Sequence, residues 1–291
     1  MNKLHQYKPT IYFIFAFAIT WVNGFFLVVQ SQQGSEKSLV NLLLAYMGPY
    51  IAALLMMYLF ANKPLRIDFR RRLFNLRLIS KKYLPFVVFL LPAAMVVSIL
   101  ISIAFGQPVE QLRFAQEFKV FDGEVILSAI ILVLVPVLEE LGWRGYGVDS
   151  LASKFNLFTT SLIFGALWSI WHLPVFFLKD SYQSGLWAQN PIFAINFFAG
   201  IFPLAIIMNY LFYKNHRSIS LIALFHVLVN YSSELFEVNQ VSKCIFTGVL
   251  AVVAIIIIAR NKTFFFNKKM NLSFVEANTA RKSMATAEHA S

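Results

Sequence analysis

Apolar runs about as long as a membrane is thick recur along the whole chain, and they constrain its fold more than any other feature. An α-helix needs about 20 consecutive apolar residues to cross the hydrocarbon core of a bilayer. Runs near this length lie at about residues 11–30, 39–61, 83–105, 123–143, 157–178, 192–213, 219–236 and 245–259. The sequence therefore predicts an all-α, polytopic membrane protein with about eight transmembrane helices.

The composition agrees with a membrane class and argues against others. Apolar residues make up 58% of the 291 residues and charged residues 13%, against about 25% charged in a soluble domain. The net charge of +11 forms neither a soluble basic face nor a recognised nucleic-acid module, so no nucleic-acid partner is expected. A single cysteine, Cys244, excludes an intramolecular disulfide.

One intramembrane domain is expected over residues 1–270, with the chemically informative motifs within 123–236. The first apolar run is longer than the core of a cleaved signal peptide, so we interpret it as the first spanning helix. Residues 271–291 are polar and rich in small side chains. That composition predicts a disordered cytoplasmic tail.

Basic residues concentrate in the connection at 62–82 and set the expected orientation. This connection carries eight lysines and arginines against one acid, Asp68. Positively charged loops face the cytoplasm, so both termini are expected there, in a bacterial cell membrane. Apolar side chains interleave with the cations, which favours contact of residues 63–82 with anionic lipid headgroups. The alternative is that the loop only determines the topology.

Two adjacent carboxylates at the inner end of the 123–143 run are the strongest chemical signal. A charge in mid-membrane costs about 2.5–3.5 kcal/mol on insertion scales, so Glu139 and Glu140 are expected to have a function. Glu140 and Arg144 lie four residues apart on one helix face, which predicts an ion pair. Glu139 points about 100° away and is left free to act as a general base. The alternative is a purely structural ion-pair cluster, with Arg144 extending to the interface.

Two histidines and an asparagine lie in other apolar runs. His226 and Asn230 share a helix face, and both can donate hydrogen bonds to a developing oxyanion. The alternative is an interhelical hydrogen bond that only supports packing. Counted from the helix starts, His172 lies deeper in the membrane than Glu139 and His226, unless its helix is tilted. The side chains expected to line a substrate pocket are Trp143, Trp168 and Trp171.

These residues resemble the motifs of a known family. Glu139-Glu140-x-x-x-Arg144, Trp168-x-x-x-His172 and His226-x-x-x-Asn230 are similar, in this order, to the three motifs of the CAAX protease and bacteriocin-processing family. That family is also called Abi and includes the type II Ras-converting CAAX endopeptidases. The resemblance covers the fourth to seventh expected helices. One departure is Trp168, where the family usually has Phe; the exchange keeps an aromatic wall.

The resemblance implies an intramembrane endopeptidase that hydrolyses peptide bonds without a covalent intermediate, with a peptide or lipidated protein as substrate. By this resemblance, Glu139 and His172 match the water-activating pair, His226 and Asn230 the oxyanion hole, and Glu140 and Arg144 the supporting positions. In relatives, the activity serves the processing of prenylated C-terminal peptides, peptide maturation or bacteriocin self-immunity.

Two alternatives stay open at this point. No cofactor is expected, but zinc held by the same glutamate and histidines is a less favoured reading, because the chain has no His-Glu-x-x-His and Asn230 is a poor zinc ligand. A non-catalytic immunity or transport protein also uses polar residues at membrane depth. The helix pattern of the first half is not repeated in the second half, which argues against a transporter.

Overall fold

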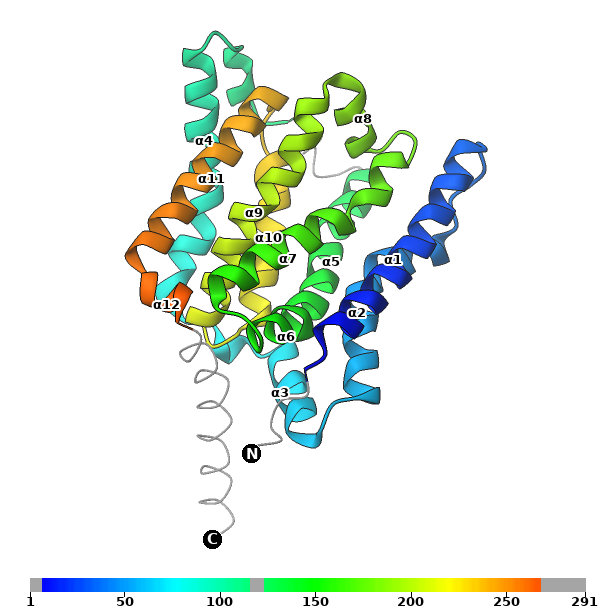
Figure 1. The fold of residues 1–291 in the computed structure, drawn as a ribbon. Helices are drawn as coiled ribbons and strands as arrows, with labels where there is room; N and C mark the ends of the chain where they lie inside the picture. Colours follow the sequence, from blue (N-terminus) through cyan, green and yellow to red (C-terminus); the bar gives the residue numbers. More distant parts are fainter. Residues whose placement is uncertain (1–6, 116–122, 268–291) are drawn as a thin grey trace.

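Helices account for the regular structure that the computed structural model describes, in residues 7–115 and 123–267, apart from an antiparallel bridge between Phe114 and Phe236 (Figure 1). The expected all-α class is confirmed. The expected disordered tail, 271–291, lies outside the described residues.

Each of the eight apolar runs coincides with a long helix. These helices are α1 (Pro9–Gln32), α2 (Leu39–Leu59), α4 (Leu84–Ala104), α5 (Gly123–Gly142), α7 (Leu157–Trp171), α9 (Pro191–Lys214), α10 (Ile219–Glu234) and α11 (Gln240–Arg260). Within the described residues, six segments are long and apolar enough to cross a membrane, as expected of a multi-pass integral membrane protein. Helix α10 has only 16 residues, and the side chains at the start of α5 are not described. The count of eight spans therefore stays a prediction.

Shorter helices join the long ones at the two ends of the bundle. At one end lie α3 (Lys63–Leu73), the π-helix η5 (Trp143–Gly147), α6 (Val148–Ala152) and α12 (Lys262–Phe266). At the other end lie the 3₁₀ helix η6 (Leu173–Phe177) and α8 (Tyr182–Gln189). Single 3₁₀ turns occur at Leu76–Leu78, Lys81–Tyr83 and Val109–Leu112.

Capping residues explain where several of the long helices begin. Ser38, Asn156 and Ser218 precede α2, α7 and α10, and each side-chain oxygen accepts a hydrogen bond from the backbone N–H three residues later. These bonds satisfy N–H groups that have no partner inside the helix. The helix boundaries therefore follow from local polar residues as well as from the length of the apolar runs.

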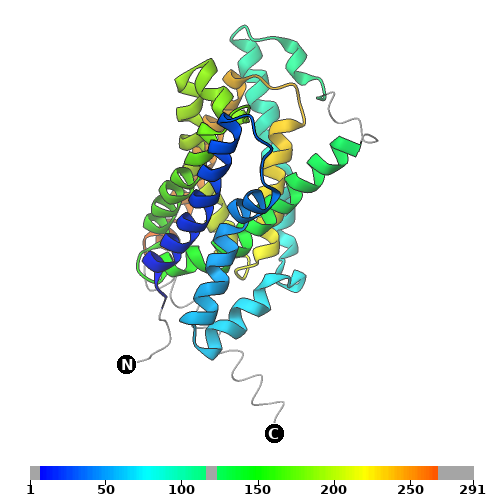
Figure 2. The ribbon, with the colours of Figure 1, turned by 90° about the vertical axis from the view of Figure 1, so that its right-hand side faces the viewer.

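Helices α5 and α10, which carry two of the three motifs, pack against each other and are enclosed by the rest of the bundle. Helix α2 packs on α5 and pairs with α1, while α7, α9, α11 and α4 pack in succession around the other side (Figures 1 and 2). The start of α1 lies at the same end of the bundle as α3 and α12 (Figure 1). The placement of both termini on the cytoplasmic side of the membrane stays a prediction.

A close backbone approach fixes the end of α5 against α2. A Cβ atom on Gly142 would lie 2.2 Å from the carbonyl carbon of Pro49 and 2.5 Å from the amide nitrogen of Tyr50. Only glycine permits this spacing, since no backbone can yield by that much without moving the helix. The contact holds the Glu139-Glu140 end of α5 at a defined height beside α2.

Candidate active site

A cavity of about 330 Å³ lies between the helices and brings the predicted catalytic residues together. Its lining includes Glu139 from α5, His172 from the end of α7, and His226 and Asn230 from α10. Most of the remaining wall is apolar, with contributions from α1, α2, α9 and η6. Four residues from three separate segments of the chain therefore face one cavity.

Glu139 is buried, yet it has no ion-pair partner among the described residues. Its side chain accepts hydrogen bonds from the indole N–H groups of Trp143, at 3.4 Å, and Trp168, at 3.2 Å. Both bonds reach the same oxygen, Oε2, and no described residue donates to Oε1. The carboxylate is thus held in place by two neutral donors, with its second oxygen free.

Trp143 does not line the cavity, contrary to the expectation from the sequence. It begins the π-helix η5 and is completely buried among other aromatic side chains, edge-on to Phe164 and Trp171. From that position its indole nitrogen still reaches Glu139. Trp168 and Trp171 do line the cavity. Contacts with aromatic side chains of α1 and α7, namely Phe13, Phe164 and Trp171, hold Trp143 outside the cavity wall.

Glu140 forms the predicted ion pair with Arg144, and it also binds a histidine. Arg144 Nη1 lies 2.8 and 2.7 Å from the two Glu140 oxygens. His226 Nδ1 lies 2.9 Å from Glu140 Oε1. Arg144 is 0% exposed, so it does not extend to the membrane interface. The face of α5 next to Glu139 therefore carries a fully paired carboxylate.

Arg144 has further partners that the sequence did not reveal. Its guanidinium lies 4.8 Å from the centre of the Phe164 ring, and Nη2 donates to Asn209 Oδ1 at 3.3 Å. Asn209 in turn donates to Ser161 Oγ at 3.1 Å. An asparagine within the apolar run 192–213 was the available signal, because a polar amide at membrane depth needs a partner.

The hydrogen bonds of the two histidines indicate which ring nitrogen acts as the donor. His172 Nδ1 lies 2.8 Å from the backbone oxygen of Trp168. Because a carbonyl only accepts, Nδ1 carries the proton, and Nε2 of the neutral ring is an acceptor. His226 likewise donates from Nδ1 to Glu140. In both rings Nε2 is left available for the cavity.

The structure explains why His172, counted from the start of its helix, was expected to lie deeper in the membrane than Glu139 and His226. Helix α7 ends at Trp171, and Pro174 belongs to the following 3₁₀ helix, η6. Helix α7 crosses the bundle obliquely (Figure 1). The end of α7, rather than its middle, thus meets α5 and α10 at the cavity.

Three polar residues of the cavity wall were not identified from the sequence. They are Thr20 of α1, Tyr46 of α2 and Gln183 of α8. None belongs to a spaced motif, so no pattern distinguished them from other residues of apolar segments. Among the side chains that the structure describes, in residues 7–115 and 132–267, no group of three His, Cys, Asp or Glu is arranged to hold a metal ion.

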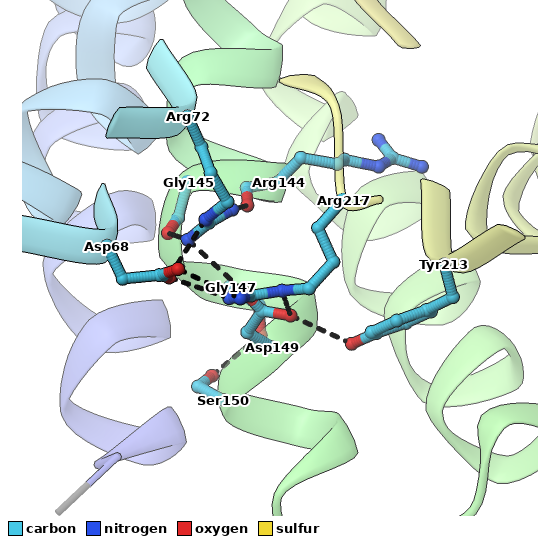
Figure 3. Close-up of polar contacts among 9 residues, drawn as sticks. All are labelled: Asp68, Arg72, Arg144, Gly145, Gly147, Asp149, Ser150, Tyr213 and Arg217. Carbon is cyan, nitrogen blue, oxygen red and sulfur yellow. Dashed lines mark hydrogen bonds and ion pairs between the residues drawn. The ribbon is translucent and has the colours of Figure 1, made fainter. Parts of the chain in front are cut away.

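A second group of charges, the ion cluster, lies at the η5 end of the bundle and consists of the half-buried Asp68 and the buried Arg72, Asp149 and Arg217 (Figure 3). Arg72 pairs with Asp68 at 2.9 Å and with Asp149 at 3.3 Å. Arg217 pairs with Asp68 at 3.0 Å and also with Asp149. Burial alone would raise the pKa of Asp68, but the two arginines hold it well below its usual value. Each charge in the cluster is therefore balanced.

The position of Arg72 separates it from its neighbours in the basic connection. Arg72 is 2% exposed, whereas Arg66, Arg70 and Arg71 on the same helix are exposed. Contact of this exposed face with anionic headgroups stays a prediction. Arg72 is therefore buried and paired inside the protein, whereas the sequence predicted that residues 63–82 contact lipid headgroups.

Comparison with known proteins identifies the family. The family model for type II CAAX prenyl endopeptidase Rce1-like proteins matches residues 121–232, which include all three motifs. A relative from Methanococcus maripaludis, CAAX prenyl protease 2, is 39% identical over 271 residues, which is 92% of this chain and 99% of the relative. The resemblance inferred from the motifs is confirmed. The chain belongs to the type II CAAX prenyl endopeptidase family and is a membrane-embedded peptide hydrolase.

Proposed function

We propose that this enzyme cleaves prenylated, membrane-associated peptides or proteins with a water molecule that Glu139 and His172 activate. The observation that carries the proposal is the composition of the cavity: a buried carboxylate, with no ion-pair partner in the part of the chain that the structure describes, shares it with two imidazoles and an amide. Unpaired charge is expensive in an apolar environment, so its retention favours a chemical role.

The free groups of Glu139 and His172 suit the activation of water. Water has two hydrogens to donate, and the cavity offers two acceptors, Glu139 Oε1 and His172 Nε2. A water held by both has its lone pair directed away from them, towards a peptide carbonyl in the cavity. As the oxygen attacks, Glu139 takes the proton and acts as the general base.

His226 and Asn230 supply donors for the oxyanion that forms at the attacked carbonyl. Asn230 donates from its side-chain amide. His226 gives its Nδ1 proton to the bond with Glu140, so it donates from Nε2 only when both ring nitrogens carry protons. Collapse of the tetrahedral intermediate then releases the amine, which takes the proton held by Glu139.

The apolar wall suits a lipidated substrate. Leu27, Leu42, Val135, Ile201 and Leu204 line the cavity around the polar residues. A prenyl chain attached to a C-terminal cysteine is the lipid that the name CAAX implies. Burial of that chain contributes about 0.8 kcal/mol for each methylene removed from water. The lipid thereby binds the substrate, while the polar end of the cavity carries out hydrolysis.

Cleavage of matched synthetic peptides tests the proposed substrate class. Purified enzyme in lipid nanodiscs is given two peptides of identical sequence, one with a farnesylated cysteine and one without, and mass spectrometry identifies the products. We expect cleavage of the farnesylated peptide and little of the other. A His172→Gln preparation, purified in the same way, reports any contaminating protease. Equal cleavage of both peptides, or none of either, contradicts the proposal.

The proposed reaction uses side chains of the chain itself and needs no metal ion. Dialysis against 1,10-phenanthroline followed by elemental analysis tests this point. Activity is expected to stay unchanged in metal-free protein. Loss of activity that added zinc restores would replace the proposed mechanism with a metal-dependent one.

A further inference from the structure

The π-helix η5 directly follows the two glutamates and depends on a residue from a distant part of the chain. In η5 the N–H of Val148 bonds to the carbonyl of Trp143, five residues earlier. Single π turns of this kind interrupt α-helices mainly at functional sites, because they alter the direction of the side chains that follow. The wider turn needs support that the helix itself does not provide.

Arg72 supplies this support by binding two successive carbonyls of η5. Its Nη1 donates to the oxygen of Arg144 at 3.0 Å, and its Nη2 donates to the oxygen of Gly145 at 3.1 Å (Figure 3). The third nitrogen, Nε, donates to Asp68 at 2.9 Å. Only a planar guanidinium has donors spaced to make all these bonds at once.

The remainder of the ion cluster fixes Arg72 and connects it to α10. Arg217 lies in the connection between α9 and α10, where His216 and Arg217 have positive φ angles of 55° and 58°. Such backbone conformations are strained and persist only where other contacts hold them. The ion pairs of Arg217 with Asp68 and Asp149 are such contacts. The start of the helix that carries His226 is thereby tied to the same cluster as η5.

A continuous series of polar contacts leads from Arg72 to the cavity. Arg72 holds the backbone of Arg144, and the Arg144 side chain binds both oxygens of Glu140. Glu140 binds His226 Nδ1 at 2.9 Å, which orients the ring within the cavity lining. A shift of η5 would therefore move the side chains that set the direction of His226.

We infer that Arg72 is a positioning residue of this enzyme, which holds η5 so that Arg144, Glu140 and His226 keep the geometry needed for the reaction. Arg72 does not touch the substrate; it acts through Arg144. The inference rests on the proposed role of His226 in the reaction.

Substitution of two adjacent arginines on α3 tests the inference. Arg72→Gln removes the charge and the fork of donors, while Arg71→Gln removes an exposed charge from the same helix and serves as the matched control. A displacement of about 1 Å in a catalytic group can cost about 100-fold, so we expect Arg72→Gln to lower kcat by about 10-fold to 100-fold with KM little changed. Arg72→Lys should recover only part of the loss. Arg71→Gln should behave as wild type.

A double substitution separates positioning from general stability. In the Glu140→Gln background the contacts between Arg72 and His226 are already interrupted, so adding Arg72→Gln should lower kcat little further. Independent effects would multiply instead. All rates are measured below the unfolding temperature of each variant and normalised to folded enzyme. Should Arg72→Gln not fold, Asp68→Asn is expected to give a smaller fall in kcat, because it weakens the ion pairs of Asp68 with Arg72 and Arg217 but leaves the bonds of Arg72 to η5.

Two results would overturn the inference: a normal kcat in folded Arg72→Gln, or full multiplication of its effect with that of Glu140→Gln. Failure of the proposed function is a separate outcome, since wild-type enzyme would then not cleave the farnesylated peptide at all.

Discussion

Two groups of charges meet at η5, and they differ in how completely they are paired. In the ion cluster, two arginines face two aspartates, and each carboxylate contacts both cations. In the cavity, Glu140 is bound by Arg144 and His226, but its neighbour Glu139 has only two indole donors on one oxygen. Carboxylates in the two groups thus have different electrostatic environments.

The difference separates support from chemistry. A carboxylate whose oxygens are all bound to cations has little tendency to take a proton from water, whereas one with a free oxygen in a cavity can do so. No residue of the ion cluster lines the cavity around Glu139. We therefore expect substitutions in the ion cluster to lower the stability of the fold or to displace the catalytic side chains. Substitutions of Glu139 are expected to abolish the reaction.

The largest effect is expected from Glu139→Gln, which keeps the shape of the side chain and removes the base. The loss of general-base catalysis should lower kcat by about 1,000-fold. The unfolding temperature in detergent should stay the same or rise, because an unpaired buried charge is removed. Steady-state cleavage of the farnesylated peptide and thermal unfolding measure the two quantities. An active variant, or an inactive one that is strongly destabilised, would remove the contrast with the ion cluster.

Asp149→Asn should have the opposite effect to Glu139→Gln, with a larger loss of stability and a smaller loss of activity. Asp149 pairs with Arg72 and Arg217, and loss of one partner from a buried ion pair costs about 3–5 kcal/mol. We expect a much lower unfolding temperature than for Glu139→Gln, with measurable activity remaining in the folded fraction. Glu110→Gln, at an exposed position, is the control. Equal stability of the Asp149→Asn and Glu110→Gln variants would contradict a structural role for the cluster.

Asn230→Ala sharpens the comparison within the cavity itself. Removal of one oxyanion donor typically lowers kcat by about 100-fold to 1,000-fold, and the fold should be little affected because Asn230 is only half-buried. Asn230→Asp should be at least as slow, since its carboxylate repels the oxyanion. If Asn230→Asp were as fast as wild type, Asn230 would not be an oxyanion donor.

The smallest effect concerns the pH dependence of stability. The pKa of Asp68 is lowered in the folded state, so this carboxylate contributes its full stabilisation above the pKa of an unfolded aspartate, near 3.8. The contribution decreases as the pH falls below that value towards the lower pKa of the folded protein. Thermal unfolding between pH 3 and pH 7 should show wild type losing its advantage over Asp68→Asn on the acid side. A constant difference across this range would contradict the pairing.

The fold could be predicted largely because bilayer thickness sets the length of the apolar runs. The Glu140–Arg144 pair was also predictable, since a spacing of four residues places both side chains on one helix face. The convergence of His172 with Glu139 and His226 was less accessible, because it depends on the oblique path of α7 and the end of that helix at Trp171.

Two features escaped the sequence for a common reason: they depend on partners far away in the chain. Trp143 is buried among aromatic side chains of other helices, Phe13, Phe164 and Trp171, and not in the cavity wall. Arg72 is similar in sequence context to Arg70 and Arg71. Its burial is decided by Asp149 and the carbonyls of η5, more than 70 residues later.

Oxygen-18 labelling tests most directly whether Glu139 activates water rather than attacking the peptide itself. Enzyme in excess over a farnesylated peptide is allowed a single turnover in labelled water, and mass spectrometry locates the label. General-base hydrolysis predicts one labelled oxygen in the new carboxyl group of the product and none in Glu139. An unlabelled product together with label in the Glu139 carboxylate would show a covalent intermediate and contradict the account.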